Sequence, residues 1–61
     1  MPEVLVHIVE GRSVAAKKAL MKDITDAVVK NFNVAADRVV VQIVESPKHS
    51  KSRGGVPFDE L

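Results

Sequence analysis

The sequence predicts an α/β fold: a single β-α-β unit with a C-terminal hairpin, which assembles into an oligomer. Two valine-rich runs of strand length, 4–9 and 39–44, flank one segment with helical periodicity, 14–32. A strand, a long helix and a second strand in this order predict a right-handed crossover and a parallel strand pair. The length of 61 residues suits one small domain, so we take 1–61 as a single domain.

Local signals mark the first strand and the start of the helix. The segment 4–9 is rich in β-branched residues, which favour strands, and Gly11 follows it as a chain breaker. Ser13 stands where a helix N-cap belongs, with a side-chain oxygen able to accept a hydrogen bond from a free amide of the first turn. We therefore expect the helix to begin at Val14.

The helix predicted over 14–32 has one apolar and one charged stripe. The apolar stripe consists of Ala16, Leu20, Ile24, Ala27, Val28 and Phe32. Asp26 and Lys30 stand four residues apart, in the order that favours an ion pair on a helix. Asn31 and Asn33 suit the exit from the helix, because asparagine tolerates the left-handed conformation that ends many helices.

The second strand carries the argument for an oligomer. Segment 39–44 is nearly apolar on both faces, which is typical of a strand with both faces buried. One helix covers only one face of a two-stranded sheet, and the chain has no second helix. Another copy of the chain is the simplest cover for the remaining face. The small size of the chain, which has no cysteine to form a disulfide, also favours oligomerisation.

The C-terminal part is a loop and a short hairpin. Segment 46–53 is polar and basic, with turn-forming residues. The pair Gly54-Gly55 predicts a hairpin turn, and segment 56–58 predicts a short extended tail. We expect this apolar tail to pack on a neighbouring subunit.

Composition excludes several classes of function. With no cysteine and only two histidines, which are far apart, the chain offers no metal-ligand cluster, and we expect neither metal nor cofactor. A net charge of +1 and two aromatic residues argue against binding to nucleic acid. No apolar run approaches the roughly 20 residues of a membrane span, and no signal peptide is recognisable. We therefore expect a soluble cytoplasmic protein without membrane contact.

Several features occur together in one order: Pro2 at the start, Glu10-Gly11-Arg12-Ser13 after the first strand, one long helix, a valine-rich second strand and Gly54-Gly55. In this order and spacing the chain resembles the 4-oxalocrotonate tautomerase family over essentially its whole length. The resemblance implies β-α-β subunits that pair into dimers, with three dimers forming a homohexamer. It also implies active sites at subunit boundaries, where the processed amino-terminal proline acts as a base.

Pro2 is the candidate catalytic base. Its nitrogen becomes a secondary amine only after removal of Met1, which a small second residue permits. An α-amino group ordinarily has a pKa of roughly 7.7–8.0, so a modest lowering leaves such a group largely neutral at pH 7. A neutral amine can take a proton from carbon next to a carbonyl group and return it elsewhere.

The other candidate site residues are cationic. Arg12 matches the family arginine that follows Glu-Gly, and its planar guanidinium suits a substrate carboxylate. The second family arginine falls at Val40, a departure from the family pattern. Arg38, two residues earlier on what we expect to be the same strand face, is a candidate replacement. Lys51 stands about where the family has a site aromatic, and Lys51 and Arg53 are further candidates for substrate binding.

Taken together, the residues and the resemblance predict an isomerase that catalyses enol–keto proton transfer on a small 2-oxo acid. A hydratase or decarboxylase that uses the same proline is a close variant. One alternative is a non-catalytic partner subunit of a mixed hexamer, in which another chain supplies the missing arginine. Another is a small basic module that binds acidic partners or RNA through Lys48, Lys51 and Arg53. We expect His7 to be a buried, hydrogen-bonded interface residue rather than a catalytic one.

Overall fold

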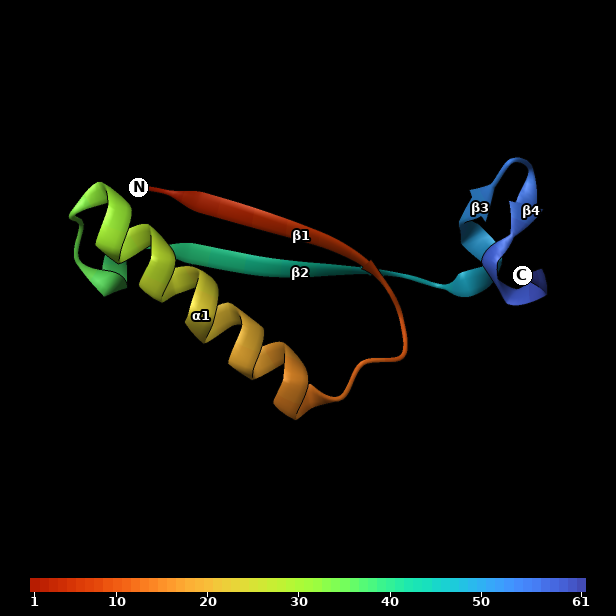
Figure 1. Ribbon diagram of the computed structural model, residues 1–61, viewed down its shortest axis with the longest axis horizontal. Coiled ribbons are helices and arrows are strands. Elements are labelled where there is room, and N and C mark those ends of the chain that lie inside the picture. The colour runs from red at the N-terminus through yellow and green to blue at the C-terminus, as the bar shows by residue number, and fades with distance from the viewer.

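The computed structural model describes residues 1–61 and consists of a β-α-β unit and a separate small hairpin (Figure 1). Its first part comprises β1 (Glu3–Val9), α1 (Val14–Phe32) and β2 (Val40–Ser46). Its second part is the hairpin of β3 (Ser52–Arg53) and β4 (Val56–Pro57). Three 3₁₀ turns complete the chain, over Ala36–Arg38, Lys48–Ser50 and Phe58–Glu60. The predicted fold class is confirmed.

Strands β1 and β2 pair in parallel, in a register that runs from Glu3 opposite Val40 to Val9 opposite Ser46. Backbone hydrogen bonds extend the pairing by one step at each end. The Val40 amide donates to the Pro2 carbonyl at 3.0 Å, and the Glu10 amide donates to the Ser46 carbonyl at 2.9 Å. The sheet therefore has two distinct ends, one beside Pro2 and one where β1 leads into α1.

Both helix ends follow the sequence signals. The Ser13 side chain accepts a hydrogen bond from the Ala16 amide at 3.1 Å, so the predicted N-cap is confirmed. At the other end Asn33 adopts the left-handed conformation, with φ 53°, and its amide donates to the Val29 carbonyl. The chain can then turn back toward β2 directly after the helix.

Replacing Asn33 with alanine is expected to destabilise the protein by about 1 kcal/mol, because a β-carbon without a compensating polar group is unfavourable in the left-handed region. The measurement is the urea midpoint of unfolding. Asn31→Ala is the matched control, since Asn31 lies inside the helix, is exposed, and loses only an exposed hydrogen bond from its side chain to the Ala27 carbonyl. Equal midpoints for the two variants would contradict a special role for the Asn33 conformation.

The structure corrects two details of the sequence prediction. Strand β2 begins at Val40, one residue later than predicted, and ends at Ser46, two residues later than predicted. Arg38 lies in the preceding 3₁₀ turn rather than on the strand, so the argument that it shares a strand face with Val40 is wrong. Strand alternation does not apply to a residue in a helical turn.

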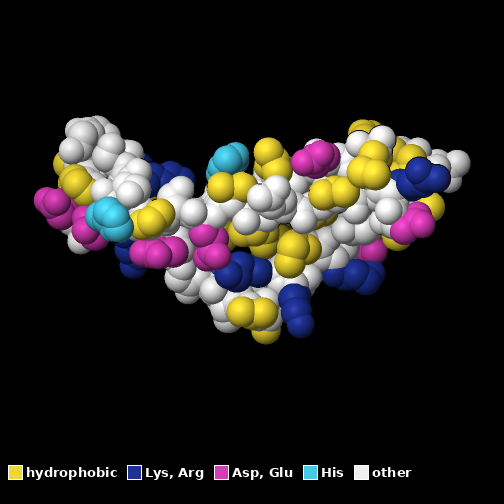
Figure 2. All heavy atoms as spheres, turned by 180° about the vertical axis from the view of Figure 1, so that it is seen from behind, with side chains coloured by type: hydrophobic (Ala, Val, Ile, Leu, Met, Phe, Trp, Pro, Cys, Tyr) yellow, Lys and Arg dark blue, Asp and Glu magenta, His cyan; other side chains and the backbone are white.

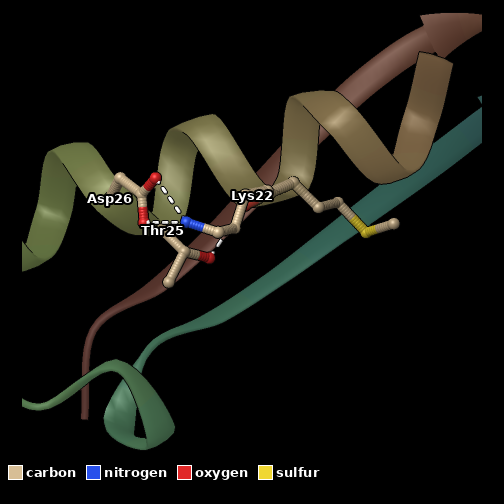
Figure 3. A network of polar contacts seen from close by, with 4 residues as sticks. Lys22, Thr25 and Asp26 are labelled. Carbon is tan, nitrogen blue, oxygen red and sulfur yellow. Dashed lines mark hydrogen bonds and ion pairs between the residues drawn. The ribbon is translucent and has the colours of Figure 1, made fainter.

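The exposed ion pair on α1 also differs from expectation. Asp26 pairs with Lys22 rather than Lys30, and the Lys22 ammonium lies 2.7 and 2.6 Å from the two Asp26 carboxylate oxygens (Figure 3). This pair contributes little to stability, because both side chains are mostly in water. A second pair joins Lys17 of α1 to Glu45 of β2 at 2.8 Å and fixes the helix against the sheet.

Helix α1 covers one face of the sheet and leaves the other open. On β1, Val4, Val6 and Ile8 are half-buried on the helix side, whereas Leu5 and His7 alternate with them and are exposed. The open face carries two exposed apolar side chains, Leu5 of β1 at 53% and Val40 of β2 at 39%, and Gln42 lies opposite Leu5 in the register. A sheet face with exposed apolar side chains therefore has no cover within the chain.

The chain has no buried core of its own. None of the 61 residues is buried, and the accessible surface is 4680 Å², whereas a compact monomer of this mass exposes about 3,900 Å². The radius of gyration is 14.5 Å, against about 10.5 Å for a compact domain of this length. Hydrophobic side chains accordingly appear across the middle of the surface in Figure 2. The hairpin lies away from the rest of the molecule, without a layer beneath it (Figure 1).

Neither α1 nor the short helical turns combine the length and the apolar character that a membrane-spanning helix requires. No group of three or more histidine or acidic side chains is placed to hold a metal ion.

Candidate active site

A cleft of about 550 Å³ opens where β1 leads into α1. This is the end of the sheet nearest the hairpin (Figure 1). We call it the Arg12 cleft; it is lined by His7, Ile8, Val9, Glu10, Gly11, Arg12, Lys48, Lys51 and Phe58. Arg12 comes from the connection between β1 and α1, and Lys48 from the turn after β2. Lys51 and Phe58 flank the hairpin. Three separate segments of the chain thus contribute to one cavity.

Local backbone features hold these segments together. Gly11 has a φ of 124°, which residues with side chains rarely adopt, so glycine lets the chain leave β1 and turn toward α1. The Glu10 carboxylate accepts a hydrogen bond from the Lys48 amide at 3.4 Å, a long contact between the two connections. The Phe58 amide donates to the Lys51 carbonyl at 2.8 Å and closes the hairpin at its open end.

The Arg12 cleft carries a positive charge excess. Three cationic side chains, Arg12, Lys48 and Lys51, line it together with one carboxylate, that of Glu10. The two ion pairs of the chain are Lys17–Glu45 and Lys22–Asp26, so none of the cleft cations is paired with a carboxylate. The cleft therefore offers unpaired cations to an incoming carboxylate.

The hairpin adds an aromatic ring to this group of cations. The Lys51 ammonium lies 5.6 Å from the centre of the Phe58 ring, and the Arg53 guanidinium carbon lies 5.4 Å from it. Both distances are within the range of cation–π attraction. Phe58 and Lys51 are half-buried, whereas Arg53 is exposed.

Pro2 lies at the opposite end of the sheet from the Arg12 cleft. Its carbonyl accepts from the Val40 amide at the start of β2, whereas Arg12 follows the end of β1. Seven strand residues separate the two ends, a span of about 20 Å at roughly 3.3 Å per residue. Met1, which precedes the proline, is 82% exposed. Within one chain Pro2 and Arg12 are too far apart to act on one small molecule.

The structure therefore divides the predicted site residues into two groups. Arg12, Lys51 and Arg53 come together at the hairpin end. Pro2 and Arg38 lie at the other end, because the turn with Arg38 leads directly into the residue that pairs with Pro2.

The residues predicted to act in the isomerase site do not include Glu10, Lys48 or Phe58, although the alternative basic module includes Lys48. Within the chain the Phe58 ring lies near Lys51 and Arg53, and its predicted packing on a neighbouring subunit stays a prediction. Glu10 and Lys48 reach the cleft through the contact between the two connections, which local patterns do not encode. One usable signal was the rarity of aromatic residues, since Phe58 is one of two in the chain.

His7 lines the cleft on the open side of the sheet. In the single chain it is exposed, and its side chain makes no hydrogen bond to another residue. Its predicted burial at an interface between subunits stays a prediction.

Comparison with known sequences identifies related proteins along the whole chain. A family model described as tautomerase enzyme matches residues 2–60. A probable tautomerase of Bradyrhizobium diazoefficiens is 50% identical over 60 residues, covering 98% of this chain and 90% of the relative. The 2-hydroxymuconate tautomerase of Pseudomonas putida is 34% identical over 61 residues, covering 100% of this chain and 97% of the relative.

Comparison with solved structures agrees with these sequence matches. A heterohexameric 4-oxalocrotonate tautomerase from Chloroflexus aurantiacus is similar with a TM-score of 0.91 and 30% identity, covering 100% of this chain and 98% of the other. Among the 4-oxalocrotonate tautomerase isozymes of Methylibium petroleiphilum, one chain matches with a TM-score of 0.88 and 31% identity, over 95% of this chain and 91% of its own. Together the sequence matches, the β-α-β architecture and these structural matches show that the chain belongs to the tautomerase family.

Proposed function

We propose that the chain is a tautomerase that interconverts the enol and keto forms of a small 2-oxo acid, with Pro2 as the base once Met1 is removed. Membership in the tautomerase family supports isomerase activity. The observation that carries the finer proposal is the Arg12 cleft, whose unpaired cations suit the carboxylate of such an acid.

The proposed reaction needs only a base that carries the proton and a cationic group that binds the substrate carboxylate. The neutral amine of Pro2 accepts the proton of the enol hydroxyl, and the same nitrogen returns a proton to carbon as the carbonyl forms. Arg12 holds the substrate carboxylate through two parallel hydrogen bonds and stabilises the negative charge of the enolate. Because one proton leaves and one returns, the substrate and product are isomers and no oxidant or reductant is consumed.

The separation of Pro2 from Arg12 supports a site shared between subunits. A substrate that touches both residues must lie where Pro2 of one chain approaches the Arg12 cleft of another. The uncovered sheet face and the lack of any buried residue independently favour assembly. We propose an assembly of identical chains, most simply a hexamer of three dimers. The similar protein from Chloroflexus aurantiacus is a heterohexamer, so the test includes the composition of the assembly.

The test is an assay of phenylenolpyruvate ketonisation with protein made without added residues. Intact mass first establishes that Met1 is absent and that a single chain type is present, and light scattering gives the oligomeric state. We expect turnover by an oligomer of identical processed chains. Processed protein without turnover would contradict the proposed reaction, and recovery of turnover only after addition of a second related chain would show that a mixed assembly is required.

A further inference from the structure

The hairpin places a ring where it can orient two cations. Lys51 has an extended backbone, with φ −136° and ψ 136°, and Arg53 lies two residues later in β3. Side chains two residues apart in extended chain point to the same side. The Phe58 ring lies within 5.6 Å of the Lys51 ammonium and 5.4 Å of the Arg53 guanidinium. One aromatic side chain thus contacts both cations.

This arrangement matters because the cations have no other anchor. The ion pairs of the chain involve neither Lys51 nor Arg53, and the side chains of these residues make no hydrogen bond within the chain. Long cationic side chains without an anchor sample many rotamers, and ordering them costs free energy when a ligand binds. A ring that attracts both cations reduces that cost beforehand.

Lys51 is placed so that it can bind a second anionic group of a ligand held by Arg12. Both residues line the same cleft, so a ligand that places one carboxylate on Arg12 finds a second cation nearby. The cleft also contains Lys48, but of its two lysines only Lys51 lies over an aromatic ring. Lys51 is therefore the second cation whose position the ring can fix.

We propose that Phe58 is a positioning residue that determines substrate specificity. Its ring holds Lys51, and beside it Arg53, so that the Arg12 cleft favours acids with two anionic groups over acids with one. The inference rests on the proposed function, because it assigns the second anion contact of that same site. Phe58 lines the cleft, and its effect on the choice between one and two anionic groups is exerted through Lys51.

The test measures binding rather than turnover. Calorimetric titration of the intact, Met1-free protein compares adipate, which has two carboxylates, with hexanoate, which has the same carbon chain and one carboxylate. Wild-type protein is expected to bind adipate more tightly. Phe58→Leu keeps an apolar side chain but removes the ring, and we expect it to weaken adipate binding about three- to fivefold without changing hexanoate binding. Phe58→Tyr keeps the ring and is expected to retain wild-type adipate affinity.

Two further variants exclude a merely structural effect. Lys51→Met removes the cation and keeps much of the apolar chain, so it is expected to lose the adipate preference even if Phe58→Leu fails to assemble. In the double variant the change at Phe58 is expected to add nothing, because Phe58 acts through Lys51. Equal weakening of both ligands by Phe58→Leu, an unchanged preference in Lys51→Met, or a wild type that does not prefer adipate would each overturn the inference.

Failure of this inference is distinguishable from failure of the proposed function. If the wild type prefers adipate, and both Lys51→Met and Phe58→Leu reduce that preference, the inference stands even where phenylenolpyruvate is not converted, and only the proposed reaction is wrong. If phenylenolpyruvate is converted and the preference for adipate is absent, the reaction stands and the role of Phe58 is wrong.

Discussion

Replacing Pro2 with alanine is expected to lower kcat/KM for phenylenolpyruvate ketonisation at least tenfold, and by as much as about 10²- to 10⁴-fold if the proline supplies the full effect of a general base. Alanine is also small enough for Met1 to be removed, so the variant keeps an amine at the same position. It loses the ring, which fixes the direction of the nitrogen lone pair. The measurement is a comparison of initial rates for processed wild type and variant, with intact mass checked for both.

A form of the wild-type chain that retains Met1 is the matched control for this prediction. It has the same side chains, but the Pro2 nitrogen is an amide and has no basic lone pair. We expect it to be inactive while keeping the oligomeric state of the processed protein. Full activity in the Met1-retaining form would show that another group acts as the base. Full activity in the alanine variant would show that the proline ring is not needed and would contradict the predicted tenfold loss.

The main elements could be predicted because their signals are local. The valine-rich runs, the helical period over 14–32, the N-cap at Ser13 and the exit at Asn33 each depend on residues close together in sequence, and the structure confirms all of them. The uncovered sheet face was also predictable, because it follows from counting helices against strand faces.

The errors arose where position in space depends on short turns or on distant contacts. Strand alternation predicts that Arg38 shares a face of the second strand, but Arg38 is the last residue of a 3₁₀ turn and precedes β2. The sequence predicts Phe58 as the end of an extended tail, whereas Phe58 begins a 3₁₀ turn and its amide donates to the Lys51 carbonyl. The packing of this tail on a neighbouring subunit stays a prediction. Hydrophobic periodicity contains no information on either contact.

The candidate site could be predicted only in part, and for a physical reason. The identities of Pro2 and Arg12 came from their order along the chain, which does not encode distance. The register of β1 and β2 is what places them at opposite ends of the sheet. A site that combines them is therefore a property of the assembly, and a fault in assembly is expected to abolish activity without touching a catalytic residue.

Replacing Leu5 with glutamate is expected to dissociate the oligomer and remove most of the tautomerase activity. Leu5 lies on the sheet face that α1 leaves open and is 53% exposed in the single chain. A carboxylate buried there without a partner costs several kcal/mol, so about 3–5 kcal/mol corresponds to roughly 10²- to 10⁴-fold weaker association. Sedimentation velocity measures the assembly, and the ketonisation assay is run at the same protein concentrations.

Leu5→Met is the matched control, since it keeps an apolar side chain of similar volume and is expected to retain both assembly and activity. If Leu5→Glu dissociates the oligomer, activity should return at protein concentrations that restore assembly, because Pro2 of one chain again meets the Arg12 cleft of another. A dissociated Leu5→Glu chain with wild-type activity would refute the shared site. An intact Leu5→Glu oligomer would show that a different surface of the chain holds the subunits together.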